Sequence, residues 1–103
     1  MENIQLWEIL VPASNKKKKI AYKWHKIWDE KVRQISGGLT ILRPAKGQWV
    51  SPTGTVFKDR MIPVRIACSE KQLMEILDLT IKHYDEEAIF AALLSEKVII
   101  KHK

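Results

Sequence analysis

Hydrophobic residues recur with two different periods along the chain, and each period predicts a different kind of element. In the run at 4–11 every second residue is apolar, with Trp7, Ile9 and Val11 on one side, which predicts a first strand. Its other side is also partly apolar, so this strand should lie inside a sheet rather than at its edge. Pro12 should end it.

Two other segments carry apolar residues at helical spacing. The first lies at 20–35 and is followed by Gly37 and Gly38, which commonly terminate helices. The second opens on a capping-box pair and should end at the acidic run 85–87. The apolar stripes are Ile20, Trp24, Ile27, Trp28, Val32 and Ile35 in the first helix, and Leu73, Ile76, Leu77, Thr80, Ile81 and Tyr84 in the second.

Between the two helices, the stretch 37–67 predicts a long β-hairpin. Its turn is the Ser-Pro-Thr-Gly sequence at 51–54, with proline at the second position and glycine at the fourth, as type I turns prefer. Gly47 favours a bulge and Pro63 cannot donate a ladder hydrogen bond, so the pairing should be irregular near one of them.

The register of this hairpin follows from the turn if pairing continues without a bulge. Trp49 then lies opposite Val56, on the side that faces the helices, and should be buried. On the other side Lys46 lies opposite Asp59, which predicts a cross-strand ion pair.

The runs GGLTIL, PAKGQW and RMIPVRIA, together with an opening strand of the form LWEILVP, resemble a family of small uncharacterised proteins from bacteria, phages and mobile elements. The resemblance covers most of the chain. It implies a ferredoxin-like α/β architecture and supplies no catalytic residues. Residues 88–94 are ambiguous, because Ala and Leu favour helix, but the family's bulkier β-type residues there imply a strand, followed by a last strand at 98–102.

The predicted order is strand, helix, strand, strand, helix, strand, within a single domain spanning residues 1–103. With right-handed crossovers, both helices fall on the same side of one mostly antiparallel sheet. The fold class predicted is therefore α+β, a ferredoxin-like sandwich whose second sheet face has no helices.

That open face should be too apolar to stay in water, so we expect it to form a homodimer interface. Glu8 of one subunit would meet Arg65 or Lys101 of the other and orient the pair. The candidate dimer interface consists of Leu6, Glu8, Leu10, Leu42 and Met61.

The chain has a net charge of +6 and a sequence pI near 9.6, which predicts attraction to polyanions. The densest basic patch is the run of four lysines at 16–19, in a stretch that reads as a mobile loop between the first strand and the first helix. The candidate ligand-binding residues are Lys16, Lys17, Lys18, Lys19, Arg65 and Lys101.

Few sequence features point to catalysis. The single cysteine, Cys68, follows an apolar strand and should be a buried, inert thiol. The three histidines share no metal-ligand spacing, and His83 with the nearby Glu86 or Glu87 is explained by solvation at a helix end. We expect no metal and no cofactor, no membrane span or signal peptide, and a location in the cytoplasm.

The function these observations favour is that of a non-enzymatic binding protein that captures an anionic ligand such as a nucleotide. A nucleic-acid-binding module on the basic ferredoxin-like sheet is an alternative, although the run at 61–67 lacks an aromatic pair that would stack bases. A small enzyme acting on an anionic substrate and a protein inhibitor of a host system are also compatible with this sequence.

Overall fold

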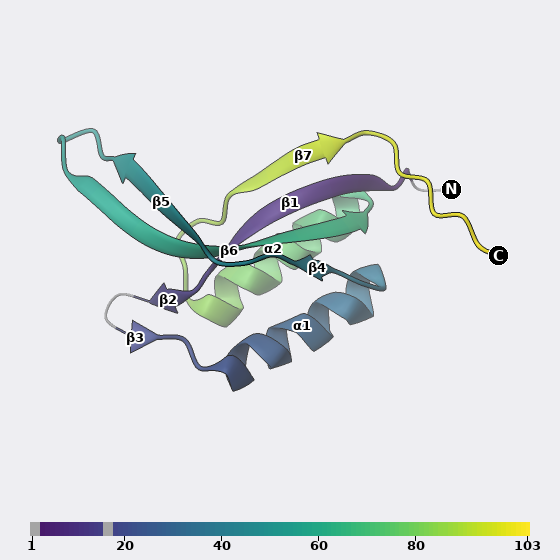
Figure 1. The fold of residues 1–103 in the computed structure, drawn as a ribbon, viewed down its shortest axis with the longest axis horizontal. Coiled ribbons are helices and arrows are strands. Elements are labelled where there is room, and N and C mark those ends of the chain that lie inside the picture. Colours follow the sequence, from purple (N-terminus) through teal and green to yellow (C-terminus); the bar gives the residue numbers. More distant parts are fainter. Residues whose placement is uncertain (1–2, 16–17) are drawn as a thin grey trace.

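The computed structural model describes residues 3–15 and 18–103, with one layer of helices packed on an antiparallel sheet (Figure 1). This is the α+β, ferredoxin-like arrangement that the sequence predicts. The elements are β1 (Gln5–Pro12), β2 (Ser14–Asn15), β3 (Lys18–Lys19), α1 (Tyr22–Ser36), β4 (Thr40–Ile41), β5 (Ala45–Val50), β6 (Val56–Cys68), α2 (Glu70–Tyr84) and β7 (Ala91–Ser95).

The main sheet has the strand order β4-β6-β1-β7, and β5 also pairs with β6. β1 is paired along both edges, with β6 on one side and β7 on the other, which confirms its prediction as an interior strand. β6 is the longest strand, at 13 residues, and its second half pairs with β1 and β4 while its first half pairs with β5.

The end of α1 and both ends of α2 lie where local chemistry predicts. α1 stops at Gly37, which has φ +86° and donates its N–H to the carbonyl of Arg33 at 2.8 Å. α2 starts with a capping box, in which Gln72 N–H donates to Ser69 Oγ at 3.2 Å and Ser69 N–H donates to Gln72 Oε1 at 3.0 Å. Asp85, with φ 54°, terminates it. Neither helix in the described part of the chain is long and apolar enough to cross a membrane.

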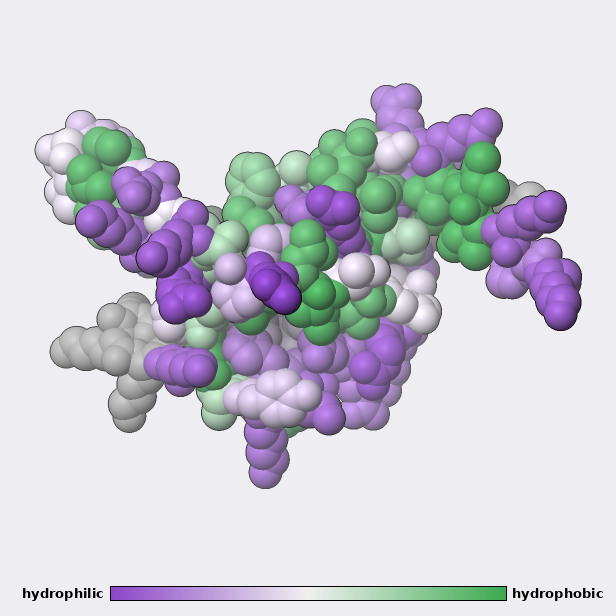
Figure 2. Space-filling model, viewed as in Figure 1, coloured by the Kyte–Doolittle hydropathy of each residue, from purple (hydrophilic) through white to green (hydrophobic). Residues whose placement is uncertain are grey.

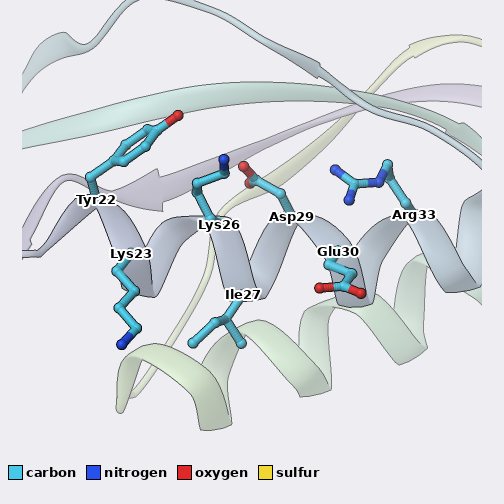
Figure 3. A pocket seen from close by; sticks show the side chains of 7 residues that line it. All are labelled: Tyr22, Lys23, Lys26, Ile27, Asp29, Glu30 and Arg33. Atoms are coloured by element: carbon cyan, nitrogen blue, oxygen red, sulfur yellow. The ribbon is translucent and has the colours of Figure 1, made fainter.

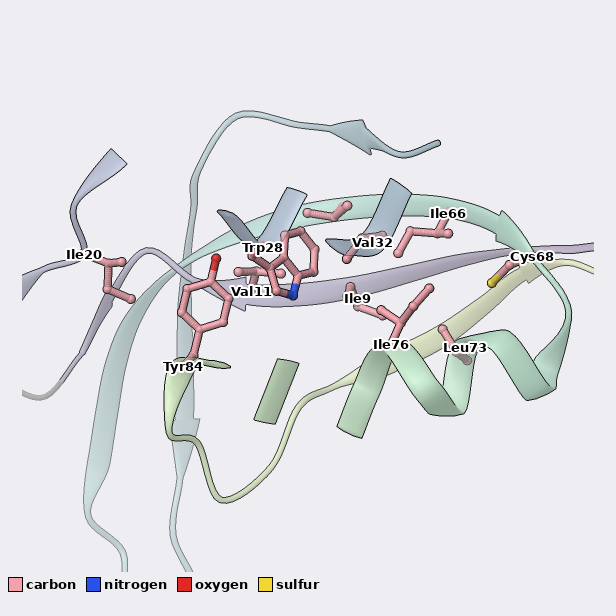
Figure 4. Packing of buried hydrophobic residues seen from close by; sticks show 11 residues of the cluster. Ile9, Val11, Ile20, Trp28, Val32, Ile66, Cys68, Leu73, Ile76 and Tyr84 are labelled. Atoms are coloured by element: carbon pink, nitrogen blue, oxygen red, sulfur yellow. The ribbon is translucent and has the colours of Figure 1, made fainter. Parts of the chain in front are cut away.

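The core lies between the sheet and the two helices (Figure 4). Ile9 of β1, Ile66 of β6, Trp28 of α1 and Ile76 of α2 are all fully buried there. Cys68 is buried with them, as predicted, and this burial raises the pKa of its thiol to about 11. The thiol therefore stays protonated at neutral pH and acts as a packing group.

The predicted hairpin is interrupted by one extra residue. Ile41 faces Val64 in the predicted register, but Ala45 already faces Met61, so four steps along one strand match three along the other. The irregularity lies next to Pro63, one of the two positions that the sequence indicates. Leu42 still donates its N–H to the Pro63 carbonyl at 2.9 Å, but proline returns no N–H to it, and the extra residue falls at 43–44, opposite Ile62.

This one-residue shift changes which residues of the outer hairpin lie opposite each other and which face they are on. Two predictions made from the unbroken register are therefore wrong. Trp49 faces Phe57 and is 50% exposed instead of buried. Lys46 faces Arg60 rather than Asp59, so the predicted cross-strand ion pair does not form. A one-residue slip exchanges the two faces of a strand, which explains both errors.

The end of the chain follows the predictions only in part. β7 confirms that the ambiguous segment contains a strand, but 98–102 forms no strand. Because β6 and β7 already occupy both edges of β1, the tail finds no free partner there, and it runs past the end of the sheet (Figure 1). Ile99 in this tail is 78% exposed.

Candidate functional site

The outer part of the hairpin, residues 45–61, projects from the body of the molecule as a two-stranded ribbon that we call the arm (Figure 1). Its turn is well formed, since Gly54 N–H donates to Ser51 O at 2.9 Å and Gly54 has φ +86°, as expected at this position. In the body of the sheet the helix-facing residues of β6 are buried, but over most of the arm both ribbon faces are exposed.

One face of the arm is basic. Arg60 and Lys58 continue, two residues at a time, the helix-facing row of β6 that includes Val64, and they lie opposite Lys46 and Gln48. All four of these polar residues are exposed, and with Asp59 they line a shallow hollow of about 240 Å³. We call Lys46, Gln48, Lys58 and Arg60 the basic face of the arm.

The cations on this face lack carboxylate partners. Among residues 3–15 and 18–103, the one ion pair is between Arg65 and Glu8, on the body of the sheet. Lys46 and Arg60 are directly opposite each other, and like charges in that position destabilise a ribbon. An anion bound between them would remove this repulsion.

The other face of the arm is aromatic. The rings of Trp49 and Phe57 stack at 4.4 Å with an interplanar angle of 14°, and the indole N–H of Trp49 donates to Asp59 Oδ2 at 3.1 Å. Met61 lies over Gly47, where a Cβ would come within 2.7 Å of its terminal methyl group. The aromatic pair is thus held on the opposite side of the ribbon from the lysines.

The strands β2 and β3, on either side of Lys16 and Lys17, begin beside the base of the arm. Ser14 pairs with Lys19 and Asn15 with Lys18, so the stretch predicted as a loop contains two short paired strands, β2 and β3. Lys16 and Lys17 lie outside the described residues. Ala13, just before β2, donates its N–H to the carbonyl of Arg60 at 3.0 Å. The loop therefore leaves the body next to the basic face.

These two stretches account for the whole net charge of the chain. Residues 16–19 and 45–61 contain seven of the 18 Lys and Arg residues but one of the 12 acidic residues, which gives +6. The remaining residues are electrically balanced. The ligand-binding residues predicted from the sequence include the lysine run but not Lys46, Lys58 or Arg60. Arg60 could hold an anion, but the sequence favoured a structural ion pair there, although the alternation of Lys58 and Arg60 with the buried residues of β6 was visible.

The open sheet face carries the predicted interface residues, but not as one continuous cluster. Leu10 of β1 lies opposite Pro63, near Met61 of β6, whereas Leu6 lies opposite Ala67 on the other side of the Glu8–Arg65 pair; all three leucine and methionine side chains are half-buried. Phe90 adds to this face, since its carbonyl accepts from the N–H of Leu10 at 3.1 Å and its side chain is 61% exposed. Figure 2 shows apolar surface along the sheet and toward the C-terminal end. Leu42 follows β4 and is half-buried.

The charged residues of the open face are arranged differently from the prediction. Glu8 lies opposite Arg65, and the two form an ion pair at 3.2 Å within one chain. Lys101 is exposed in the tail beyond β7 and does not join Arg65 in one site. The six predicted ligand-binding residues therefore do not form a single cluster among the described residues.

A second hollow, of about 320 Å³, lies on the outer side of α1 (Figure 3). Asp29 points between Lys26 and Arg33, while burial raises the pKa of its carboxyl. The mixed charges make this surface close to neutral, so it is a weaker anion site than the arm.

A polar aromatic cluster joins α1 to α2. Trp24, expected in the core, is partly exposed and stacks on His83 at 4.0 Å, and His83 Nε2 lies 2.9 Å from Trp24 O. His25 Nδ1 lies 2.7 Å from the buried hydroxyl of Tyr84. Burial lowers the pKa of both imidazoles, and these groups all have partners within the cluster, which indicates a structural role.

The described residues contain no group of three or more His, Cys, Asp and Glu side chains that is arranged to hold a metal ion.

No protein-family model and no curated protein matches the sequence. Solved structures with the same fold include the divalent cation tolerance protein CutA1 of Thermus thermophilus, which is 9% identical with a TM-score of 0.67; the match covers 97% of this chain and 87% of that one. A phage SAM lyase in complex with S-methyl-5'-thioadenosine is 10% identical with a TM-score of 0.65, covering 93% and 84%. The CutA protein of Archaeoglobus fulgidus is 9% identical with a TM-score of 0.63, covering 97% and 86%. At these identities the comparisons establish the fold alone.

Proposed function

We propose that this is a small binding protein that captures an anionic, nucleotide-like ligand on the basic face of the arm. The observation that carries the proposal is the placement of Lys46, Lys58 and Arg60 on one exposed surface without a carboxylate partner in the described structure. Stability alone would favour an acidic residue at one of these positions. A bound phosphate group would supply the missing negative charge.

The chemistry of the basic face suits a phosphate-bearing ligand. The Arg60 guanidinium offers a planar fork of donors, and the two lysine ammonium groups add point charges. Gln48 lies opposite Lys58 and supplies an amide that can donate or accept hydrogen bonds, as a ribose or base requires. The lysine run at 16–19 then raises the local concentration of anions around the site.

The comparisons are compatible with such a role. The phage SAM lyase structure contains S-methyl-5'-thioadenosine, a nucleoside derivative, on the same fold. The CutA proteins are named for tolerance of divalent cations, so divalent metal ions are a second candidate class of ligand for this chain. A ligand screen must therefore contain nucleotides, nucleosides and divalent metal ions side by side.

The test is a thermal-shift and calorimetric screen with ATP, AMP, S-methyl-5'-thioadenosine and copper(II) chloride. A ligand that binds the folded state at about 100 times its Kd stabilises it by about 2.7 kcal/mol. We expect ATP or AMP to stabilise the wild type. The triple variant K46S/K58S/R60S should lose this effect.

The matched control is K71S/K82S/K97S, which removes the same charge from exposed positions away from the arm. Equal nucleotide binding by the two triple variants would contradict the proposal. Stabilisation by copper with no response to any nucleotide would also contradict it and would favour the cation class.

We also propose that two copies pair through the open sheet face. Leu10, Leu42 and Met61 leave an apolar surface there, with Phe90 exposed beside Leu10 and Leu6 on the other side of the Glu8–Arg65 pair, and a second copy would bury it. The pairing of Glu8 with Arg65 inside one chain means that these two residues do not orient the dimer as the sequence predicts. Membership of the family of small bacterial and phage proteins, and a cytoplasmic location, stay predictions from the sequence.

A further inference from the structure

We propose that the arm is also a nucleic-acid-binding ribbon, which enters the major groove of a duplex with its basic face toward the bases and phosphates. This inference rests on the proposed function, because it takes the same basic face as the anion-binding surface. It goes further by naming a polymer, double-stranded nucleic acid, as the partner.

The dimensions of the arm fit this partner. Neighbouring strands lie about 5 Å apart, so a two-stranded ribbon with its side chains is narrow enough for the major groove of B-DNA, which is about 12 Å wide. Lys46 with Arg60 and Gln48 with Lys58 form two rows on the ribbon, about 7 Å apart along the strands. The basic face is on the same side of the sheet as the helices, and the arm extends past both of them (Figure 1).

The residues on the basic face are suited to both parts of a duplex contact. Lysine and arginine neutralise phosphates and release counterions, which supplies affinity without sequence preference. Arginine and glutamine can also form paired hydrogen bonds with the edges of guanine and adenine. Arg60 and Gln48 lie in adjacent rows on opposite strands, so both reach the same side of the ribbon.

The charge distribution supports a polymeric partner. Residues 16–19 and 45–61 hold all of the net charge of +6, and Ala13, just before β2, is hydrogen-bonded to the Arg60 carbonyl. Positive charge concentrated in two separate segments matches the repeated charges of a nucleic-acid backbone better than a single phosphate group. The rest of the chain is balanced and would not repel the duplex.

The aromatic residues argue for a duplex rather than a single strand. Proteins that bind single strands place stacking aromatics within the basic groove itself. Here Trp49 and Phe57 lie on the opposite face of the ribbon and stack on each other, so bases bound at the basic face do not reach them.

The test is fluorescence anisotropy with a labelled duplex of about 20 base pairs and with one of its strands alone, between about 50 and 200 mM salt. Each phosphate contact contributes about 0.9 to the slope of log K against log salt. With one phosphate neutralised by each of the three cations, the slope for the wild type is steeper by about 2.7. Between about 50 and 200 mM salt its affinity should therefore fall about 40-fold more than that of K46S/K58S/R60S. The control K71S/K82S/K97S should follow the wild type.

Three results overturn the inference in distinguishable ways. If nucleotides bind at the arm but the wild type does not bind the duplex, the ribbon is refuted and the proposed function stands. Equal binding of the duplex by both triple variants would place any nucleic-acid contact elsewhere. Tighter binding of the single strand than of the duplex would exclude entry into the groove. Far-UV circular dichroism of each variant verifies that it is folded.

Discussion

The hydrogen bond between Trp28 and Thr80 gives the sharpest test of the packing between the two helices. Trp28 is 1% exposed, and its indole N–H donates to Thr80 Oγ1 at 2.9 Å. The Thr80 hydroxyl in turn donates to the carbonyl of Ile76 at 2.6 Å. Thr80→Val keeps the shape of the side chain but leaves the buried indole N–H without an acceptor.

The expected cost follows from the unpaired donor. A buried polar group left without its partner costs about 1–3 kcal/mol, and about 2 kcal/mol is the central value. For a domain of this size, each kcal/mol lowers Tm by about 4–8 °C, so Thr80→Val should lower Tm by about 8–16 °C. In urea, the midpoint should fall by about 1 M at an unchanged slope of about 2 kcal/mol per M.

A second background separates the hydrogen bond from other effects of the substitution. In Trp28→Phe the indole N–H is absent, so adding Thr80→Val should cost at least about 1 kcal/mol less than it does in the wild type. Thr80→Ser retains the hydroxyl and is the control for the lost bond. A cost for Thr80→Val below about 0.5 kcal/mol, or the same cost in both backgrounds, would refute the reasoning.

Three further predictions follow from other parts of the molecule. Burial lowers the pKa of His25 and His83 below 6.5, so the unfolded chain binds more protons than the folded chain in mild acid. The free energy of unfolding should therefore fall as the pH decreases from about 7 to 5. The urea midpoint at each pH measures this change, and a constant midpoint would contradict it. Cys68 should react with a thiol reagent only in denaturant, whereas rapid native labelling would show that it is accessible. Leu42→Asp should dissociate the proposed dimer in light scattering, and a wild type that is already a 12.0 kDa species would exclude that dimer.

Local sequence signals were sufficient where a feature depends on neighbouring residues. The capping box of Ser69 and Gln72, the glycine stop at Gly37 and the hairpin turn at 51–54 were all predicted and are all present. Each of these features closes its hydrogen bonds within a few residues, so the residue types alone determine the geometry. Together with the period of the apolar stripes, they were enough to predict the α+β fold.

Strand pairing across the sheet was decided by the tertiary structure. The extra residue next to Pro63 shifts the outer hairpin by one position and moves Trp49 to the solvent. Nothing in the local sequence distinguished this irregularity from one at Gly47. In the same way, Val98–His102 has the composition of a strand, but no free edge of β1 remains for it to pair with.

The candidate site depends on the same shift. The sequence alone determined that the protein is basic and that its lysines cluster at 16–19. Only the register of the hairpin brought Lys46 opposite Arg60 and removed Asp59 from that position. Because side chains alternate between the faces of a strand, a single inserted residue decided whether the arm carries an ion pair or an exposed basic face.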